Sequence, residues 1–566
     1  MKIKKTGYLL IFICAAILSI YSFSLLAEKT YILFDIGEME TKMLYFEHIL
    51  LFVIFYLILR LVKNNYIRLI GIGFFSLIYM ILHQAATAFI VDCIFLLVLI
   101  WIGEIILVTS RKSCVEDSII VRYLNSFSAG SLAYIIFICV LSALHLASKK
   151  GVRFFTLGLV MVVVITYVLM RFFKIIVPLV KNNTEKTSKF ENKNFFCIGS
   201  AISLSAILLQ IGRINITLDY DSLRYGLRSL SVLVGNTGIY DNLGTVNDVY
   251  VYPKGLEILT LALNTKKSFG FVLSFSYICA IMVLFTVFEI VKVCSEKRTD
   301  KSWLAVVLVS VTPAIMNMGL SAKTDMITLL MQLISILNMC LYVKKRHSYY
   351  ITFALIALLA SIIYKPTSLL FSLGIGIANI IYLVTDFIKN KNKINGIIII
   401  LGLILGAGYV FLSQKLVSND IISLQKKYSG DFFFDILTKK SYVNLLILIV
   451  IAVIIAILVN TLVAKKYFSD IHRIAGVHGT HLSSRQKEQK ERSSKNTSLR
   501  VKLIKRNLSL FSHGTLLANI FSSYLLSIII FAGAIINIRR EGGLQLGIEF
   551  YPFAICFGFS MALLMM

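Results

Sequence analysis

Charged residues are scarce in this chain of 566 residues. Asp, Glu, Lys and Arg make up 15% of it, whereas soluble globular proteins carry about 25%. Hydrophobic residues make up 58%, which is more apolar surface than a soluble core can bury. The composition therefore excludes an ordinary soluble protein and predicts a polytopic membrane protein.

Other patterns are missing as well. The nine cysteines are an odd number, lie mostly inside apolar segments and show no paired spacing, which excludes a disulfide framework. The apolar runs are continuous rather than alternating, which excludes the strands of a membrane β-barrel. The sequence has no Gly-rich phosphate loop and no soluble nucleotide-binding domain, so we expect no nucleotide-dependent chemistry.

Apolar runs of the length that crosses a bilayer as a helix, roughly 17–25 residues, recur from end to end. We therefore predict an all-α polytopic membrane protein with about 15–16 transmembrane helices. The expected spans are 6–27, 45–62, 69–83, 87–109, 124–147, 154–172, 195–212, 268–292, 303–319, 326–343, 350–363, 368–385, 396–413, 444–464, 514–536 and 548–566.

The spans divide the chain into four regions. Residues 1–194 form an N-terminal membrane region of about six helices, and Met1–Ala27 is read as an uncleaved signal anchor. A second membrane module follows at 195–464, with a long polar loop at 213–267. A basic loop at 465–513 separates this module from C-terminal membrane helices at 514–566.

Orientation follows from the short loops, because Lys and Arg collect on the cytoplasmic side of membrane proteins. When the spans are counted from the start of the chain, the basic N-terminus and most basic turns fall on the same side of the membrane; Lys149, Lys150 and Arg153 are exceptions. We therefore expect a multi-pass protein of the cytoplasmic membrane, with a cytoplasmic N-terminus and loop 213–267 outside. The net charge of +28 reads as this orientation signal against anionic lipid, so no nucleic-acid partner is expected.

The outer loop is where the polar residues gather. It opens on Asp219 and Asp221, directly after an apolar segment. Asp221 is well placed to cap a helix, and Arg224 and Arg228 then stand one turn apart, away from an apolar face. Pro253 suits the first turn of a second helix. We expect two interfacial helices, joined by a polar loop, at the lipid–water boundary.

Motifs in this loop and in the next two outer turns resemble C-type (GT-C) membrane glycosyltransferases. They are Asp221-Ser222-Leu223-Arg224-Tyr225, Tyr252-Pro253-Lys254-Gly255-Leu256-Glu257, Ser321-Ala322-Lys323-Thr324-Asp325 and Lys365-Pro366-Thr367. In that superfamily the first outer loop carries an acidic motif, often Asp-x-Asp or Asp with Tyr four residues later. Many relatives have His after that Tyr, where this chain has Gly226. The resemblance covers about residues 195–385 and implies that 195–464 is a catalytic module using a polyprenyl-phosphate sugar.

Such a transfer needs a base for the acceptor hydroxyl and positive charge for the departing phosphate. The resemblance makes Asp221 the base, which implies inversion at the anomeric carbon. Asp219 either assists or, with Asp325, holds a divalent cation such as Mg²⁺ or Mn²⁺. The implied partners are the lipid-linked donor, a glycan, lipid or protein acceptor, and membrane lipids. Four basic residues are candidates for the donor phosphate: Arg224, Arg228, Lys254 and Lys323.

Other interpretations stay open. Asp221 is also read as a plain helix cap, and each basic residue as a headgroup contact. An envelope-polysaccharide polymerase or ligase should place Arg and His in large outer loops. The basic residues of the outer loop 414–443 are all Lys, with no Arg or His. A transporter or lipid-linked-glycan flippase should show repeats, broken helices or intramembrane charges. Asp92 and Glu104 lie within one span, and with no basic residue in the middle of another span we expect them to be buried and hydrogen-bonded.

Overall fold

The computed structural model describes residues 39–107, 118–173, 193–215, 222, 255–263, 269–294, 299–345 and 347–365, and nine separate positions between 372 and 404. These residues are mostly helical and include no strand, so the predicted all-α class is confirmed. The helices are α2 (Met39–Leu61), α3 (Asn65–Leu82), α4 (Ala86–Ile106), α5 (Ile119–Ala143), α6 (Lys149–Phe172), α7 (Lys193–Ile211), α9 (Gly255–Leu259), α10 (Gly270–Cys294), α11 (Thr299–Ser310), α12 (Pro313–Gly319), α13 (Asp325–Lys345) and α14 (Ser348–Tyr364).

Eight of these helices are long and apolar enough to cross a membrane: α2, α3, α4, α5, α6, α7, α10 and α13. Their bounds agree with the predicted spans to within a few residues. The local sequence explains several starts. Asn64 caps α3 by accepting hydrogen bonds from the backbone N–H groups of Tyr66 and Ile67, and the Ser148 side chain accepts from Gly151 at the start of α6.

One predicted span, 303–319, is broken into two helices. α11 ends at Ser310, and α12 begins at Pro313 after two residues outside both helices. Proline lacks a backbone N–H and disfavours helical geometry in the residue before it. Thr312 accordingly has an extended conformation, with φ −81° and ψ 111°. The expectation of one continuous helix here was wrong.

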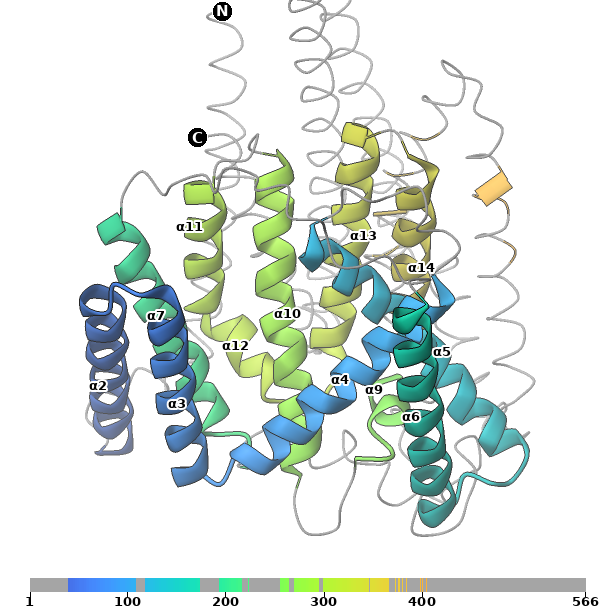
Figure 1. Ribbon diagram of the computed structural model, residues 1–566, viewed down its shortest axis with the longest axis horizontal. Coiled ribbons are helices and arrows are strands. Elements are labelled where there is room, and N and C mark those ends of the chain that lie inside the picture. The colour runs from blue at the N-terminus through green and yellow to red at the C-terminus, as the bar shows by residue number, and fades with distance from the viewer. Residues whose placement is uncertain are drawn as a thin grey trace, which may run out of the picture.

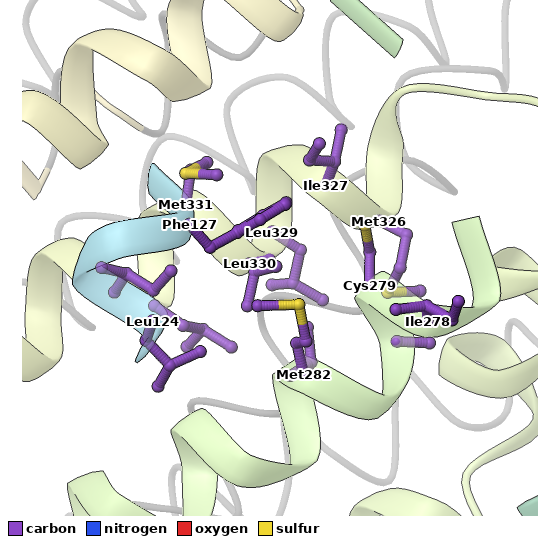
Figure 2. Packing of buried hydrophobic residues seen from close by; sticks show 14 of the residues in the cluster. Leu124, Phe127, Ile278, Cys279, Met282, Met326, Ile327, Leu329, Leu330 and Met331 are labelled. Carbon is purple, nitrogen blue, oxygen red and sulfur yellow. The ribbon is translucent and has the colours of Figure 1, made fainter. Parts of the chain in front are cut away.

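The core is built by α5, α10 and α13. α13 is buried from Asp325 to Val343, and Figure 2 shows side chains from these three helices pointing into one shared apolar cluster. The helices α2, α3 and α6 instead expose large apolar side chains, such as Leu69, Phe74 and Phe154. In a chain of this composition, such faces are suited to contact with lipid tails.

Two glycines allow α4 and α5 to cross closely (Figure 1). A Cβ atom on Gly103 of α4 would lie 1.9 Å from the Ser126 carbonyl oxygen, and one on Gly130 of α5 would lie 1.8 Å from the Leu99 carbonyl oxygen. Both obstacles are backbone atoms, so neither could move aside alone. Small residues at such crossings are the usual means of close helix packing in membranes.

Polar side chains join the buried helices. Asn125 and Asn338 exchange two amide hydrogen bonds, of 3.1 and 2.7 Å. Glu104 of α4 accepts hydrogen bonds from the Arg122 guanidinium and from the Ser126 hydroxyl. A buried, hydrogen-bonded Glu104 is as expected, but its basic partner Arg122 on the neighbouring helix was not foreseen. Pairs of this kind hold membrane helices in register.

The connections segregate to two ends of the bundle. At one, the loop end, Asn215 donates hydrogen bonds to the carbonyls of His83 and Gln84. At the other, the basic end, Arg60 pairs with Asn194, and the Lys344 ammonium donates to the Val293 carbonyl. The segments predicted to share a side of the membrane therefore lie at the same end of the bundle.

Candidate functional site

The predicted site residues divide into two groups. Asp219, Asp221, Arg224, Arg228 and Lys254 lie outside the described residues, so their assignments stay predictions. Lys323 and Asp325 are described, in the turn before α13 and at its first residue. Ser222 and Gly255, which directly follow two members of the first group, are also described.

Ser222 is packed against the turn that carries Lys323 and Asp325. Its hydroxyl oxygen accepts a hydrogen bond of 2.9 Å from the Ala322 backbone N–H, 100 residues away in the sequence. Ser222 is fully buried, so this contact is shielded from water. A buried side chain bonded to a backbone N–H is a strong positional restraint. The chain segment next to Asp221 thus meets the segment Ser321–Asp325 at the loop end.

Asp325 forms a mostly buried ion pair with Lys365. The Lys365 ammonium lies 2.5 Å from the Asp325 carboxylate, and 15% and 7% of the two side chains are exposed. Asp325 begins α13, where a carboxylate complements the helix dipole, and Lys365 directly follows α14. Because α13 and α14 pack along each other, the pair joins the loop ends of two core helices.

The returning part of the outer loop reaches the same region. Helix α9 has five residues, all of them buried, and it packs on α5 and α14. A Cβ atom on Gly255 would lie 2.3 Å from Cδ1 and 2.7 Å from Cα of Tyr364, the residue before Lys365. After α9, the Ala262 carbonyl accepts a hydrogen bond from Arg153. Arg153, one of the basic residues predicted to lie on the outer side, thus contacts this segment.

A polar cluster fixes the chain where the outer loop begins. The Tyr79 hydroxyl donates a hydrogen bond of 2.5 Å to the Glu47 carboxylate, and His83 lies 3.1 Å from the same carboxylate oxygen. Asn215 binds the carbonyl of His83. Burial lowers the pKa of the Arg213 guanidinium, and the nearby Tyr79 hydroxyl opposes that shift. These residues tie the end of α7 to α2 and α3 and were not predicted from the sequence.

These contacts bring together three segments that are far apart in sequence: the start of the outer loop, its return, and the turns at Asp325 and Lys365. Lys365 was part of a recognised motif, but no role was assigned to it. Lys365 pairs with Asp325 because α13 packs against α14, and no local sequence pattern reveals that packing. Within the described residues no three His, Cys, Asp or Glu side chains gather as metal ligands. The predicted metal site involves Asp219, which lies outside them, and stays a prediction.

Comparison with protein-family models, with curated proteins and with solved structures found no match to this chain.

Proposed function

We propose that this chain is a membrane glycosyltransferase that moves a sugar from a polyprenyl-phosphate donor to an acceptor on the extracytoplasmic side. The observation that carries the proposal is the Ser222–Ala322 hydrogen bond. It holds the segment next to Asp221 against the turn of Lys323 and Asp325, where the Asp325–Lys365 pair lies. We infer that Asp221 and the basic groups act together there, as a base and phosphate neutralisation require.

The proposed reaction is a displacement at the anomeric carbon. Asp221 removes the proton of the acceptor hydroxyl, and the acceptor oxygen forms a bond to that carbon. The bond from the anomeric carbon to the phosphate oxygen breaks, and the polyprenyl phosphate leaves with the electron pair. Attack opposite the leaving group inverts the configuration. General-base catalysis of this kind contributes roughly 10²- to 10⁴-fold.

Positive charge must collect where the phosphate departs. Lys323, with Arg224, Arg228 and Lys254, is proposed to supply it, and Lys365 extends this set. Asp325 is proposed to position the Lys365 ammonium, since the two side chains form an ion pair in which both are mostly buried. A lysine held this way acts on phosphate as a point charge without a fixed bonding plane. A divalent cation held by Asp219 and Asp325 would supply the same charge by displacing Lys365 from the carboxylate.

The base assignment is tested by Asp221→Asn. Asparagine has the same size and caps a helix about as well, but it cannot accept the proton. Transfer measured with the full chain in detergent should fall about 10²- to 10⁴-fold, with the melting temperature unchanged. Asp248→Asn, in the same loop but outside the acidic motif, is the matched control and should keep activity. A fully active Asp221→Asn protein would remove the base assignment.

The donor class is tested separately. The outer side of the membrane has no supply of nucleotide sugars, and the sequence has no nucleotide-binding domain. A screen of purified protein against polyprenyl-phosphate sugars should therefore yield transfer from at least one of them. Transfer from a nucleotide sugar with no lipid-linked sugar present would refute the proposed donor.

One observation favours a second candidate, a transporter or flippase of lipid-linked glycans. The break between α11 and α12 is the kind of discontinuous helix that lines substrate sites in transporters. Proteoliposomes separate the two candidates. A transporter moves a labelled lipid-linked sugar across the bilayer without any acceptor, whereas the glycosyltransferase consumes it only when an acceptor is present.

A further inference from the structure

Asp92, in the outer-loop half of α4, has an environment that no structural role explains. The side chain is fully buried, and neither carboxylate oxygen has a hydrogen-bond partner among the described residues. Glu104, twelve positions later on the same helix, is equally buried yet bonded to Arg122 and Ser126. Asp92 was expected to be hydrogen-bonded, and among the described residues its one candidate partner is the Ser274 hydroxyl, with no basic residue in the place that Arg122 takes beside Glu104.

Three neutral side chains with an oxygen or sulfur atom lie near Asp92. Ser274 of α10 and the thiols of Cys93 and Cys279 lie close enough to interact with it. The Ser274 hydroxyl is buried and, in the part of the chain that the structure describes, its only polar neighbour of this kind is the Asp92 carboxylate, at a geometry too poor for a full hydrogen bond. Helix α10 packs directly on α4. Asp92 and Ser274 thus lie where these two packed helices meet.

The cationic groups of the helices packed against α4 act elsewhere. Arg122 of α5 binds Glu104, Arg153 of α6 binds the Ala262 carbonyl, His83 of α3 faces Glu47 and Lys292 of α10 faces Glu289. Lys149, Lys150 and Arg171 stand at the two ends of α6, and Arg68 of α3 binds the Val62 carbonyl. Tyr134 of α5 is hydrogen-bonded to Thr156. Across the described helices, no ion pair reaches Asp92.

An ionised carboxylate in the interior of a membrane protein is strongly unfavourable unless a positive charge compensates it. One carboxylate balances one positive charge, and serine hydroxyls are neutral oxygen ligands. A divalent ion would keep an uncompensated charge, and the described residues offer no cluster of three metal-ligating side chains. The charge balance therefore fits a monovalent ion.

We propose that Asp92, with Ser274, forms a binding site for one small monovalent cation, either a proton or a sodium ion. Asp92 is the seventh residue of α4 and Ser274 the fifth of α10. Both are counted from the loop end, so the site lies about 6–9 Å of helix from it. The cation therefore enters from the side of the outer loop. This site does not depend on glycosyl transfer and would exist equally in a transporter.

The test is thermal unfolding of the full-length protein in detergent, followed by size-exclusion of heated samples. One arm compares NaCl with choline chloride at equal ionic strength and pH 8. The other varies pH from 5 to 9 in choline chloride. A ligand that binds only the folded state raises the melting temperature with saturating dependence on its concentration. A rise with Na⁺ identifies sodium, and a rise only on acidification identifies the proton.

The variants decide whether Asp92 is responsible. Asp92→Asn is neutral and of the same size, so it should lose the dependence and should melt at least as high as the wild type at pH 8 without sodium. Asp300→Asn, in the first turn of α11, is the control and should keep the dependence. Ser274→Ala should require several-fold more cation for the same rise, and it decides the matter if Asp92→Asn does not fold.

Two results would overturn the site. The first is that neither Na⁺ nor acidification raises the melting temperature of the wild type more than that of Asp92→Asn. The second, where Asp92→Asn does not fold, is a Ser274→Ala protein whose cation dependence is identical to that of the wild type.

Discussion

The ion pair between Asp325 and Lys365 predicts an unusual pattern of stability. Lys365→Met removes the ammonium but keeps an unbranched side chain, leaving the Asp325 carboxylate, 7% exposed, without its cation. Removing one member of a buried pair costs about 3–5 kcal/mol, because the remaining charge stays buried. We expect a loss of stability in that range for Lys365→Met.

The double variant Asp325→Asn/Lys365→Met should be more stable than Lys365→Met alone. It contains no buried charge, and its remaining cost is one buried amide with poor hydrogen bonding, about 1–3 kcal/mol. A second substitution that restores stability is the mark of a pair in which each charge compensates the other. The rescue expected from these two costs is on the order of 2 kcal/mol.

Unfolding by SDS in mixed micelles measures all four members of this double-mutant cycle. Lys301→Met, in α11, provides the control, because its effect should add to that of Asp325→Asn without rescue. A double variant less stable than Lys365→Met would refute the reasoning. Under the proposed function, the rescued double variant should also remain poor at transfer, since it folds without the Lys365 charge.

Two further predictions concern the helix packing, and both use the same unfolding assay. Gly130→Ala places a Cβ against the Leu99 backbone and should lower the free energy of unfolding by at least about 1–3 kcal/mol. Gly158→Ala, where an added Cβ would have no atom within 4 Å, is the control and should not lower it. Equal effects of the two substitutions would contradict the close crossing. Asn338→Leu removes the amide exchange with Asn125 and should cost about 0.6–1.7 kcal/mol. No loss at all would show that the pair does not hold α5 and α13 together.

The sequence predicted the helices well, because a bilayer imposes a length and an apolar composition that a single segment reveals. It failed at 303–319, where the apolar run is continuous and the break depends on Pro313 alone. That signal was present in the sequence, since proline inside a helix removes a hydrogen bond. The prediction followed the apolar composition of the segment instead of the proline.

Pairings between helices were the part that the sequence did not reveal. Glu104 and Arg122 were each visible, but their contact depends on how α4 and α5 cross. Asp325 was singled out and Lys365 belonged to a noted motif, yet the ion pair joins residues 40 positions apart and depends on how α13 and α14 align. The position of Asp92 inside a span was visible in the sequence. Local sequence could not show that its neighbour on α10 would be Ser274 rather than a basic residue.

The contact between Gly255 and Tyr364 has a consequence for evolution. The atoms that a Cβ at position 255 would meet include the Cα of Tyr364, so a change of the tyrosine rotamer could not accommodate it. Descendants of this sequence can exchange Gly255 only if the backbone of α9 moves away from α14. Substitutions at 255 should therefore occur together with insertions or deletions in the adjoining loops, and seldom with a compensating change at 364.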